Sequence, residues 1–311
     1  MAAAVYGAPG LRGVAGPYPQ RESVLFIGTP SVTHLPPPLE SPAAACETAV
    51  PDLVLDQQQR VHVIMGWAGS RVLTRGLAFA PSPACHGVGG FADSDIRAGD
   101  IILRLDRALM VTHQTCFKSL PPLERVQMPE FSSLVLWLVQ QRLLKERSAW
   151  HGFVRTLPGP ADIQSALFLD EDTVSNLPDE VRGACQRARA RAAAALGFIA
   201  ETVRDSPQVA ELRDQLPRLF DRELGLWAAA VILSRGFNVK GRTLLLPFVD
   251  LVNSQRQGAT CELEFDATGA PILRATSDIP RAQEVFIEYG VEKSDADLLA
   301  NYGYSHNHQA L

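Results

Sequence analysis

Two segments in the last quarter of the chain place polar side chains at the ends of apolar runs. Residues 244–254 carry Asp250 and Asn253, and residues 284–290 carry Tyr289. A carboxylate, an amide and a phenol are groups that hold and orient a ligand by hydrogen bonds. These three side chains are therefore the first candidates for a binding or catalytic site.

The interval between the two segments has the pattern of a β-hairpin. Apolar and polar residues alternate in residues 261–265 and again in 272–276, and the turn-forming run 266–269 lies between them. Period-2 alternation on both sides of a short turn with glycine is typical of two antiparallel strands. The predicted hairpin joins the segment that carries Asn253 to the segment that carries Tyr289.

The order and spacing of these residues resemble the SET domain, and more narrowly the Rubisco large-subunit lysine methyltransferase branch of that family. The matching residues, in chain order, are His86-Gly87-Val88-Gly89-Gly90, Trp150 with Phe153 and Leu157-Pro158, Ser234-Arg235-Gly236-Phe237, Pro247 with Asp250 and Asn253, Tyr289-Gly290, Lys293-Ser294 and Asn301-Tyr302-Gly303-Tyr304. The resemblance covers roughly residues 55–305. It rests on the order and spacing of the motifs together.

The resemblance implies an α+β fold, namely a β-rich SET domain of several small sheets with pseudoknot-like threading and a helical insert. The strand that carries Tyr289 should lie beside the segment at Asn253 and be partly threaded, which is rare in proteins. We expect the domain over residues 53–311, with the insert at about 122–220. Residues 1–52 are rich in Ala, Gly and Pro, which predicts a disordered tail. The family's C-terminal substrate-binding domain is expected to be absent.

The implied activity is transfer of a methyl group from S-adenosylmethionine to a lysine of a non-histone protein. A lysine amine has a pKa near ~10.4 and must lose its proton before it attacks. A narrow, apolar and aromatic channel favours the neutral amine. The resemblance makes Tyr289 the catalytic residue, whose hydroxyl orients the amine. The alternative is a core tyrosine at the end of a strand.

The resemblance also assigns the other site residues. It implies cofactor contacts from His86, Gly87, Val88, Gly89, Asn253 and Ser254, and substrate contacts from Arg235, Asp250, Tyr302 and Tyr304. Glycine would let the backbone approach the cofactor closely. Other interpretations stay open: Asn253 as a turn residue, Arg235 in a structural salt bridge, and Asp250 bonded to backbone amides.

The chain departs from the family pattern at several positions. Ser254 stands where the family has histidine, His86 where an acidic residue is common, and Val239 where a second arginine usually follows. Two other functions stay open; the resemblance includes a relative for the first, and Ser254 with the expected absence of the C-terminal domain favours the second. One is protein-histidine methylation, and the other is a non-catalytic SET-like module that binds protein partners.

Residues 122–236 are helical in character. The run 131–144 is apolar nearly all round, which predicts a buried helix. A second helix is expected over 218–235, with one buried stripe formed by Phe220, Leu224, Trp227 and Val231. A basic face on the helix that starts near Pro178 is either solvated or a docking patch; it consists of Arg182, Arg187, Arg189 and Arg191.

Three further local patterns carry predictions. Residues 95–102 and 278–285 echo each other as turn-strand units, and SET domains carry such a unit at both places. Ser294 and Asp297 have the spacing of a capping box that opens a helix, and Gly303 can end it. That helix would place Tyr302 and Tyr304 near the core.

Composition and charge limit the possible partners. The 311 residues carry a net charge of −5, so no nucleic-acid partner is expected. The sequence has no apolar run of about 18 residues, so no membrane span is expected. Five scattered cysteines without a Cys-x-x-Cys pair indicate a reducing compartment and no bound metal. We expect a monomer with a protein substrate, in the cytoplasm or nucleus. A chloroplast location is the alternative, because an acid-poor start also fits a transit peptide.

Overall fold

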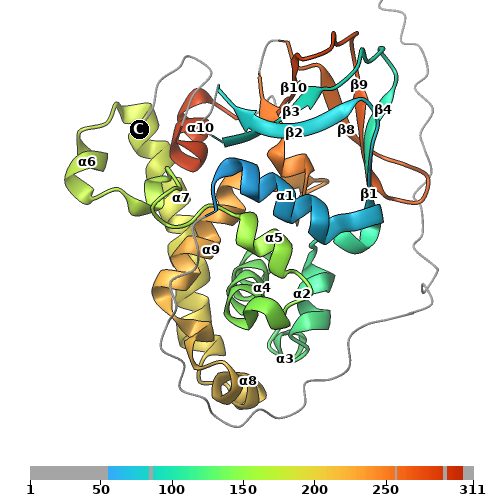
Figure 1. Cartoon of the computed structure of the whole chain (residues 1–311). Helices are drawn as coiled ribbons and strands as arrows, with labels where there is room; N and C mark the ends of the chain where they lie inside the picture. The colour runs from blue at the N-terminus through green and yellow to red at the C-terminus, as the bar shows by residue number, and fades with distance from the viewer. Residues whose placement is uncertain (1–54, 84–86, 256–257, 290–292, 304–311) are drawn as a thin grey trace, which may run out of the picture. The chain divides into compact units, whose positions relative to one another are not determined.

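A computed structural model describes residues 55–83, 87–255, 258–289 and 293–303 (Figure 1). The predicted tail at 1–52 lies outside these ranges, and so do His86 and Tyr304. The described residues all belong to one unit, Leu53–Leu311. Within it the strands gather together, and most of the helices lie in the long interval between β4 (Ile101–Leu105) and β5 (Gly236–Val239) (Figure 1).

Three small sheets hold the strands of the described residues. The first has the order β1 (Val72–Thr74), β4 (Ile101–Leu105), β9 (Pro271–Ala275), β8 (Cys261–Phe265). The second has the order β2 (Leu77–Ser82), β3 (Gly87–Ala92), β10 (Glu284–Ile287), β7 (Asn253–Ser254). The third is the pair β5 (Gly236–Val239) and β6 (Arg242–Leu245). Small sheets with helices between them confirm the predicted α+β class.

The predicted hairpin is formed by β8 and β9. Leu263 pairs with Leu273 in antiparallel register, and β9 begins at Pro271, one residue earlier than expected. Gly269 in the turn has a φ of +77°, a left-handed conformation that favours glycine. The hairpin was therefore predictable from alternation and turn chemistry alone.

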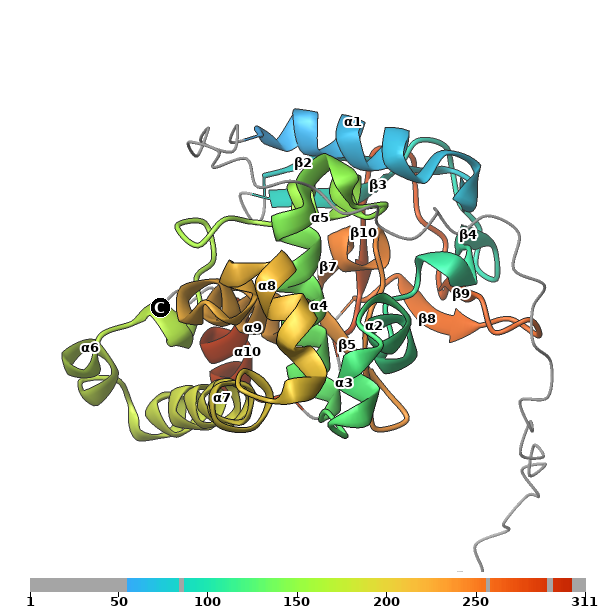
Figure 2. The same cartoon turned by 90° about the horizontal axis from the view of Figure 1, so that it is seen from below.

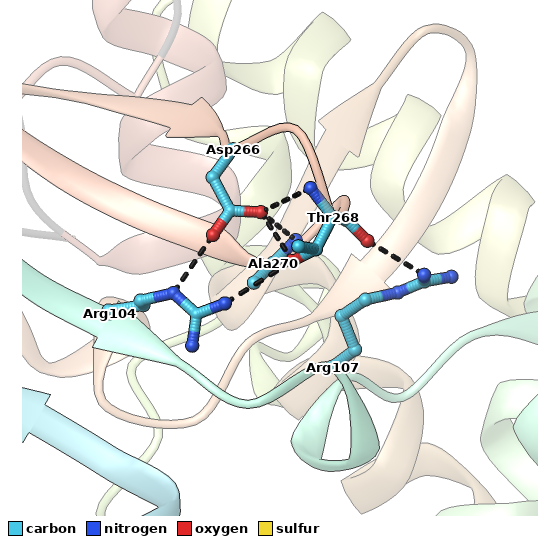
Figure 3. Close-up of polar contacts among 5 residues, drawn as sticks. All are labelled: Arg104, Arg107, Asp266, Thr268 and Ala270. Atoms are coloured by element: carbon cyan, nitrogen blue, oxygen red, sulfur yellow. Dashed lines mark hydrogen bonds and ion pairs between the residues drawn. The ribbon is translucent and has the colours of Figure 1, made fainter. Parts of the chain in front are cut away.

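The tip of this hairpin is clamped to β4 and the turn that follows it (Figure 3). The Asp266 carboxylate accepts hydrogen bonds from the Thr268 hydroxyl at 2.6 Å, the Ala270 amide at 3.0 Å and Arg104 Nε at 2.8 Å. Arg107 Nη1 donates to the Thr268 carbonyl at 2.7 Å. The bond from the Thr268 hydroxyl, followed by those from Ala270 and Arg104, holds the pKa of Asp266 well below its usual range.

We expect Asp266→Asn to lower the free energy of unfolding by about 1 kcal/mol at pH 7, because it removes charge-assisted hydrogen bonds at a partly exposed site. A carboxylate with a lowered folded pKa stabilises the fold above its unfolded pKa and loses that effect as the pH falls. The difference in the free energy of unfolding between wild type and variant, measured by urea unfolding, should therefore shrink from pH 6 to pH 3. Asp214→Asn, on the exposed side of α8 (Ala210–Gln215), is the control. A gap independent of pH would contradict the clamp.

The two echoing turn-strand units bind each other. Ile96 and Ile279 exchange backbone hydrogen bonds at 3.0 and 2.9 Å. The Asp95 carboxylate accepts from the Arg281 amide, and the Asp278 carboxylate accepts from the Ala98 amide, both at 2.8 Å. Each unit thus supplies the same aspartate cap to the other, and together they join the start of β4 to the start of β10.

The helices of the described residues are α1 (Gln57–Ala68), α2 (His113–Ser119), α3 (Pro122–Arg125), α4 (Glu130–Leu144), α5 (His151–Thr156), α6 (Glu171–Ser175), α7 (Asp179–Phe198), α8 (Ala210–Gln215), α9 (Arg222–Arg235) and α10 (Asp295–Tyr302). The predicted buried helix at 131–144 is α4, which buries every residue from 132 to 141. Two of its buried amides, Gln140 and Gln141, bond to each other, to Ser119 and to Ser148. The buried Trp137 Nε1 of the same helix has no hydrogen-bond partner among the described residues.

The helix expected over 218–235 begins later, as α9 at Arg222. Pro217–Phe220 is a separate 3-10 turn, and the Asp221 carboxylate caps the amide of Leu224 at 3.3 Å. Residues 227–232 are all buried, so α9 is enclosed rather than striped. Trp227 Nε1 donates to the Pro158 carbonyl at 2.9 Å, which ties α9 to the turn after α5.

The four arginines on the basic face of α7 each contact another part of the described chain. Arg189 donates to two carbonyls and to Glu171, and Arg182 bonds Asp179 and two carbonyls at the start of the helix. Arg191 lies over the Phe131 ring, 4.4 Å from its centroid. Arg187 pairs with Asp297 at 2.7 Å and so joins α7 to α10. These contacts bind elements together, and α10 lies beside α7 in both views (Figures 1 and 2).

The predicted helix after residue 293 is α10. The Ser294 hydroxyl accepts from the Asp297 amide at 3.1 Å, and the Asp297 side chain bonds the Ser294 amide at 3.3 Å, which confirms the capping box. Gly303 ends the helix with a φ of +75°. A Cβ there would lie 2.2 Å from the Gln164 Cβ, so glycine is required for packing as well as for conformation. Tyr302 is the last residue of α10.

Candidate functional site

Strand β10 brings distant residues together because it lies between β3 and β7. It is antiparallel to β3, where Val285 pairs with Gly90, and parallel to β7, where Phe286 pairs with Asn253. The prediction that the Asn253 segment and the strand leading to Tyr289 lie side by side is thus confirmed. Gly89 lies across β10 from Asn253, close enough that a Cβ on Gly89 would come within 3.0 Å of Asn253 Nδ2.

Tyr289 follows β10 and is bound to the β7 segment at both ends. Its backbone N–H donates to the Ser254 hydroxyl at 3.2 Å. Its own hydroxyl donates to the Val252 carbonyl at 3.1 Å. The phenol oxygen is therefore held at the backbone of Val252, the residue that precedes Asn253. Ser254, which stands where histidine is usual in the resemblance, acts here as the anchor of the Tyr289 backbone.

Tyr289 and Tyr302 form a stacked pair that holds a cation. Their ring centroids are 5.0 Å apart and the planes differ by 26°. Lys293 Nζ lies 5.0 Å from the Tyr302 centroid and 5.8 Å from the Tyr289 centroid, and it donates to the Tyr302 hydroxyl at 2.6 Å. Ring faces attract ammonium groups. The pair thus has the chemistry needed to accept an alkylamine or its protonated form.

A carboxylate that the sequence reasoning missed lies beside Asn253. Glu284 accepts from Asn253 Nδ2 at 2.6 Å and from the Ser82 hydroxyl at 3.1 Å. A Cβ on Gly89 would lie 2.3 Å from Glu284 Oε1. Four strands therefore meet at one point, with one residue from each of β2, β3, β7 and β10.

Arg235 and Asp250 form an ion pair next to this segment. Arg235 Nη1 donates to Asp250 Oδ2 at 3.1 Å and to the Asp250 carbonyl at 3.2 Å. The Asp250 side chain is 3% exposed, and its Oδ1 has no hydrogen-bond partner among the described residues. Burial raises the pKa of Asp250, and Arg235 opposes that rise. The pair holds the end of α9 against the turn that leads to Val252, which favours the structural salt bridge for Arg235.

We expect Arg235→Met to lower the free energy of unfolding by about 3 kcal/mol at pH 8, because it leaves a buried carboxylate without its cation. The folded pKa of Asp250 is raised, so its ionised form costs stability as the pH rises, and protonated Asp250 needs no cation. The loss should therefore be smaller at pH 5 than at pH 8 in chemical denaturation. Arg242→Met, an exposed arginine on β6, is the control. An equal loss at both pH values would contradict this account.

Comparison with solved structures shows what this arrangement is. The chain superimposes on Rubisco large-subunit methyltransferase bound to AdoMet with a TM-score of 0.65, at 20% identity over 79% of this chain and 56% of that one. The SET domain of the same enzyme bound to lysine and AdoHcy gives 0.64, at 18% identity over 80% and 57%. The fold is that of a SET domain.

Sequence comparison finds relatives that are N-methyltransferases or carry a SET domain by name. The aldolase-lysine N-methyltransferase of Arabidopsis thaliana is 25% identical over 264 residues, 79% of this chain and 52% of the relative. The Rubisco large-subunit N-methyltransferase of Pisum sativum is 25% identical over 252 residues, 75% and 48%. SET domain-containing protein 4 of Mus musculus is 25% identical over 237 residues, 70% and 52%. The chain spans about half the length of these relatives. No family model matches it.

The SET domain brings together most of the predicted cofactor residues. Gly87 and Val88 pair with Ser82 and Pro81 along β3, and Gly89 follows them into the cluster around Glu284. Asn253 and Ser254 lie across β10 from β3. His86 and Tyr304 lie outside the described residues, so their roles stay predictions. Arg235 and Asp250 bind each other, and their predicted contacts with substrate stay a prediction too.

Three further properties concern the described residues only. None of their helices combines the length and the apolar character that a membrane span needs. Among them no three side chains of His, Cys, Asp or Glu gather in a way that could hold a metal ion. Burial raises the pKa of Cys261 to about 12, so its thiol stays protonated at neutral pH.

Proposed function

We propose that this SET domain is a protein-lysine N-methyltransferase that uses S-adenosylmethionine. The observation that carries the proposal is the attachment of the Tyr289 hydroxyl and backbone to the β7 segment, directly beside Asn253. One of the relatives named above is a lysine N-methyltransferase by name, and a second is a Rubisco large-subunit N-methyltransferase. Two solved structures with this fold hold AdoMet, or lysine with AdoHcy.

The residues of β3 and β7 on the two sides of β10 fit the cofactor. Gly87 and Gly89 are the proposed backbone contacts on β3, because glycine lets a ligand approach the backbone closely. Asn253 and Ser254 offer side-chain and backbone groups for hydrogen bonds, and His86 and Val88 complete the proposed contact set. The bound cofactor would supply a methyl group on a positively charged sulfur, so the protein needs only to align and desolvate the reactants.

The lysine of the protein substrate would approach the Tyr289–Tyr302 pair. The Tyr289 hydroxyl orients the amine, and the ring faces stabilise positive charge, as they do for Lys293. A low-polarity, aromatic surrounding favours the neutral amine, which is the form that attacks. Arg235, Asp250 and Tyr304 are the further substrate-side residues in this proposal.

The remaining parts of the proposal concern organisation. We place the domain at residues 53–311 with a helical insert at about 122–220, preceded by a disordered tail. The partner is a protein substrate and the protein acts as a monomer, without nucleic acid or membrane. We place it in the cytoplasm or nucleus. Two relatives are chloroplast proteins, which keeps the chloroplast as the alternative.

Calorimetric titration with S-adenosylmethionine, followed by mass spectrometry of a cell extract incubated with the protein, tests this function. We expect one binding site and the addition of one or more methyl groups to lysine of a protein in the extract. Methyl groups found on histidine would move the assignment to histidine methylation. Protein that binds the cofactor and methylates nothing would support the partner-binding module instead.

A further inference from the structure

Glu284 lies in the middle of the proposed cofactor residues. It is the first residue of β10, and its two carboxylate oxygens have different partners. Oε1 accepts from Asn253 Nδ2 on β7 at 2.6 Å, and Oε2 accepts from the Ser82 hydroxyl on β2 at 3.1 Å. Gly89 on β3 leaves the space that the carboxylate fills, because a Cβ there would be 2.3 Å from Oε1.

These contacts fix the orientation of the Asn253 amide. An ionised carboxylate only accepts hydrogen bonds, so the NH₂ group of Asn253 must face Glu284. The amide oxygen of Asn253 then faces away from Glu284. A hydrogen bond to an ionised carboxylate is about twice as strong as one between neutral groups. Ser82 holds the other carboxylate oxygen, which prevents Glu284 from turning away.

We propose that Glu284 is a positioning residue that presents the amide oxygen of Asn253 to the ammonium group at the amino-acid end of the cofactor. An ammonium group only donates hydrogen bonds, so it needs an acceptor at this point. If the amide were reversed, its NH₂ group would repel the ammonium. Glu284 decides between these two orientations without touching the cofactor. This inference rests on the proposed function.

Reversing the hydrogen bond between the two side chains tests the inference. Glu284→Gln lets the Asn253 amide turn either way, and Asn253→Asp places two carboxylates against each other. In the double variant, the amide NH₂ of the new glutamine donates to one oxygen of the new aspartate. The other aspartate oxygen then faces the ligand as an acceptor. Each variant is titrated with S-adenosylhomocysteine by calorimetry at a temperature where circular dichroism shows it folded.

We expect each single variant to bind S-adenosylhomocysteine about 10-fold more weakly, the usual effect of removing one charge-assisted hydrogen bond. The double variant should return to within about threefold of wild type, because the acceptor is restored. Glu262→Gln removes an exposed carboxylate on β8 and controls for the change in net charge. The affinity of the Ser82→Ala variant for S-adenosylhomocysteine should lie between those of wild type and Glu284→Gln.

Three results would overturn the inference. Losses that add in the double variant would show that amide orientation does not matter. Unchanged affinity in Glu284→Gln would show that Glu284 does not position Asn253. A lower unfolding temperature with unchanged affinity would make the contact purely structural. Wild-type protein that does not bind S-adenosylhomocysteine at all would instead overturn the proposed function, together with this inference.

Discussion

Replacing Tyr289 by phenylalanine should lower the rate of methyl transfer ~10²-fold or more, the usual value of one positioned hydrogen-bonding group. Phenylalanine keeps the ring that stacks on Tyr302, and the backbone bond to Ser254 does not involve the side chain. In the free protein the substitution removes the hydrogen bond from the Tyr289 hydroxyl to the Val252 carbonyl. Because the ring stacking and the backbone bond to Ser254 remain, cofactor affinity and unfolding temperature should change little.

The measurement is single-turnover methylation of the substrate protein found in the extract, followed by intact-mass spectrometry. Tyr302→Phe is the matched variant, since it also removes one phenol hydroxyl from the stacked pair. The Tyr302 hydroxyl accepts a hydrogen bond from Lys293. Removing this hydroxyl should therefore weaken amine binding more than it slows methyl transfer. A Tyr289→Phe protein as active as wild type would show that the catalytic residue lies elsewhere.

Gly89→Ala should weaken S-adenosylmethionine binding about 100-fold, because one added methyl group displaces the whole cluster around Glu284. The new Cβ would lie 2.3 Å from Glu284 Oε1, 3.0 Å from Asn253 Nδ2 and 3.1 Å from the Ser82 Cβ. Real Cβ atoms do not come within 2.3 Å of another heavy atom, so the carboxylate or the β3 backbone must move. Either movement breaks the hydrogen bonds that hold Asn253.

Gly66→Ala is the control for this variant. Gly66 lies inside α1, and nothing is within 4 Å of a Cβ added there. Alanine in the interior of a helix is favoured by about 1 kcal/mol over glycine. The control should bind the cofactor as wild type does and unfold at a slightly higher temperature. Calorimetry on both variants is the measurement, and a Gly89→Ala protein with wild-type affinity would contradict the proposed cofactor position.

Local patterns predicted local structure well. The β8–β9 hairpin follows from alternation around Asp266 and Gly269, and the capping box of α10 follows from the spacing of Ser294 and Asp297. In each case the interacting residues are near neighbours in the sequence. The partner of every such group could therefore be found within a few positions. The α9 helix shows the limit, since its burial on all sides depends on helices that sequence periodicity does not describe.

The site was predictable only through the resemblance, and only in part. Tyr289 and Asn253 were placed together correctly because the order of motifs implied it. Glu284 was missed, since its contacts cross 31 residues to Asn253 and 202 residues to Ser82. A glutamate at the start of a strand gives no local signal of such partners. The register between paired strands decides which side chains of different strands become neighbours, and this register is a property of the folded sheet.

The mutual capping of the two turn-strand units has a consequence for the order of folding. Its bonds join residues 180 and 186 positions apart in the sequence. Closing so long a loop is entropically costly, and these contacts can form only after residues 278–281 have been made. β10 and the Tyr289 that follows it should therefore dock late, after the intervening helices have packed. A newly made chain would thus have a folded helical core before it has a site that could bind a ligand.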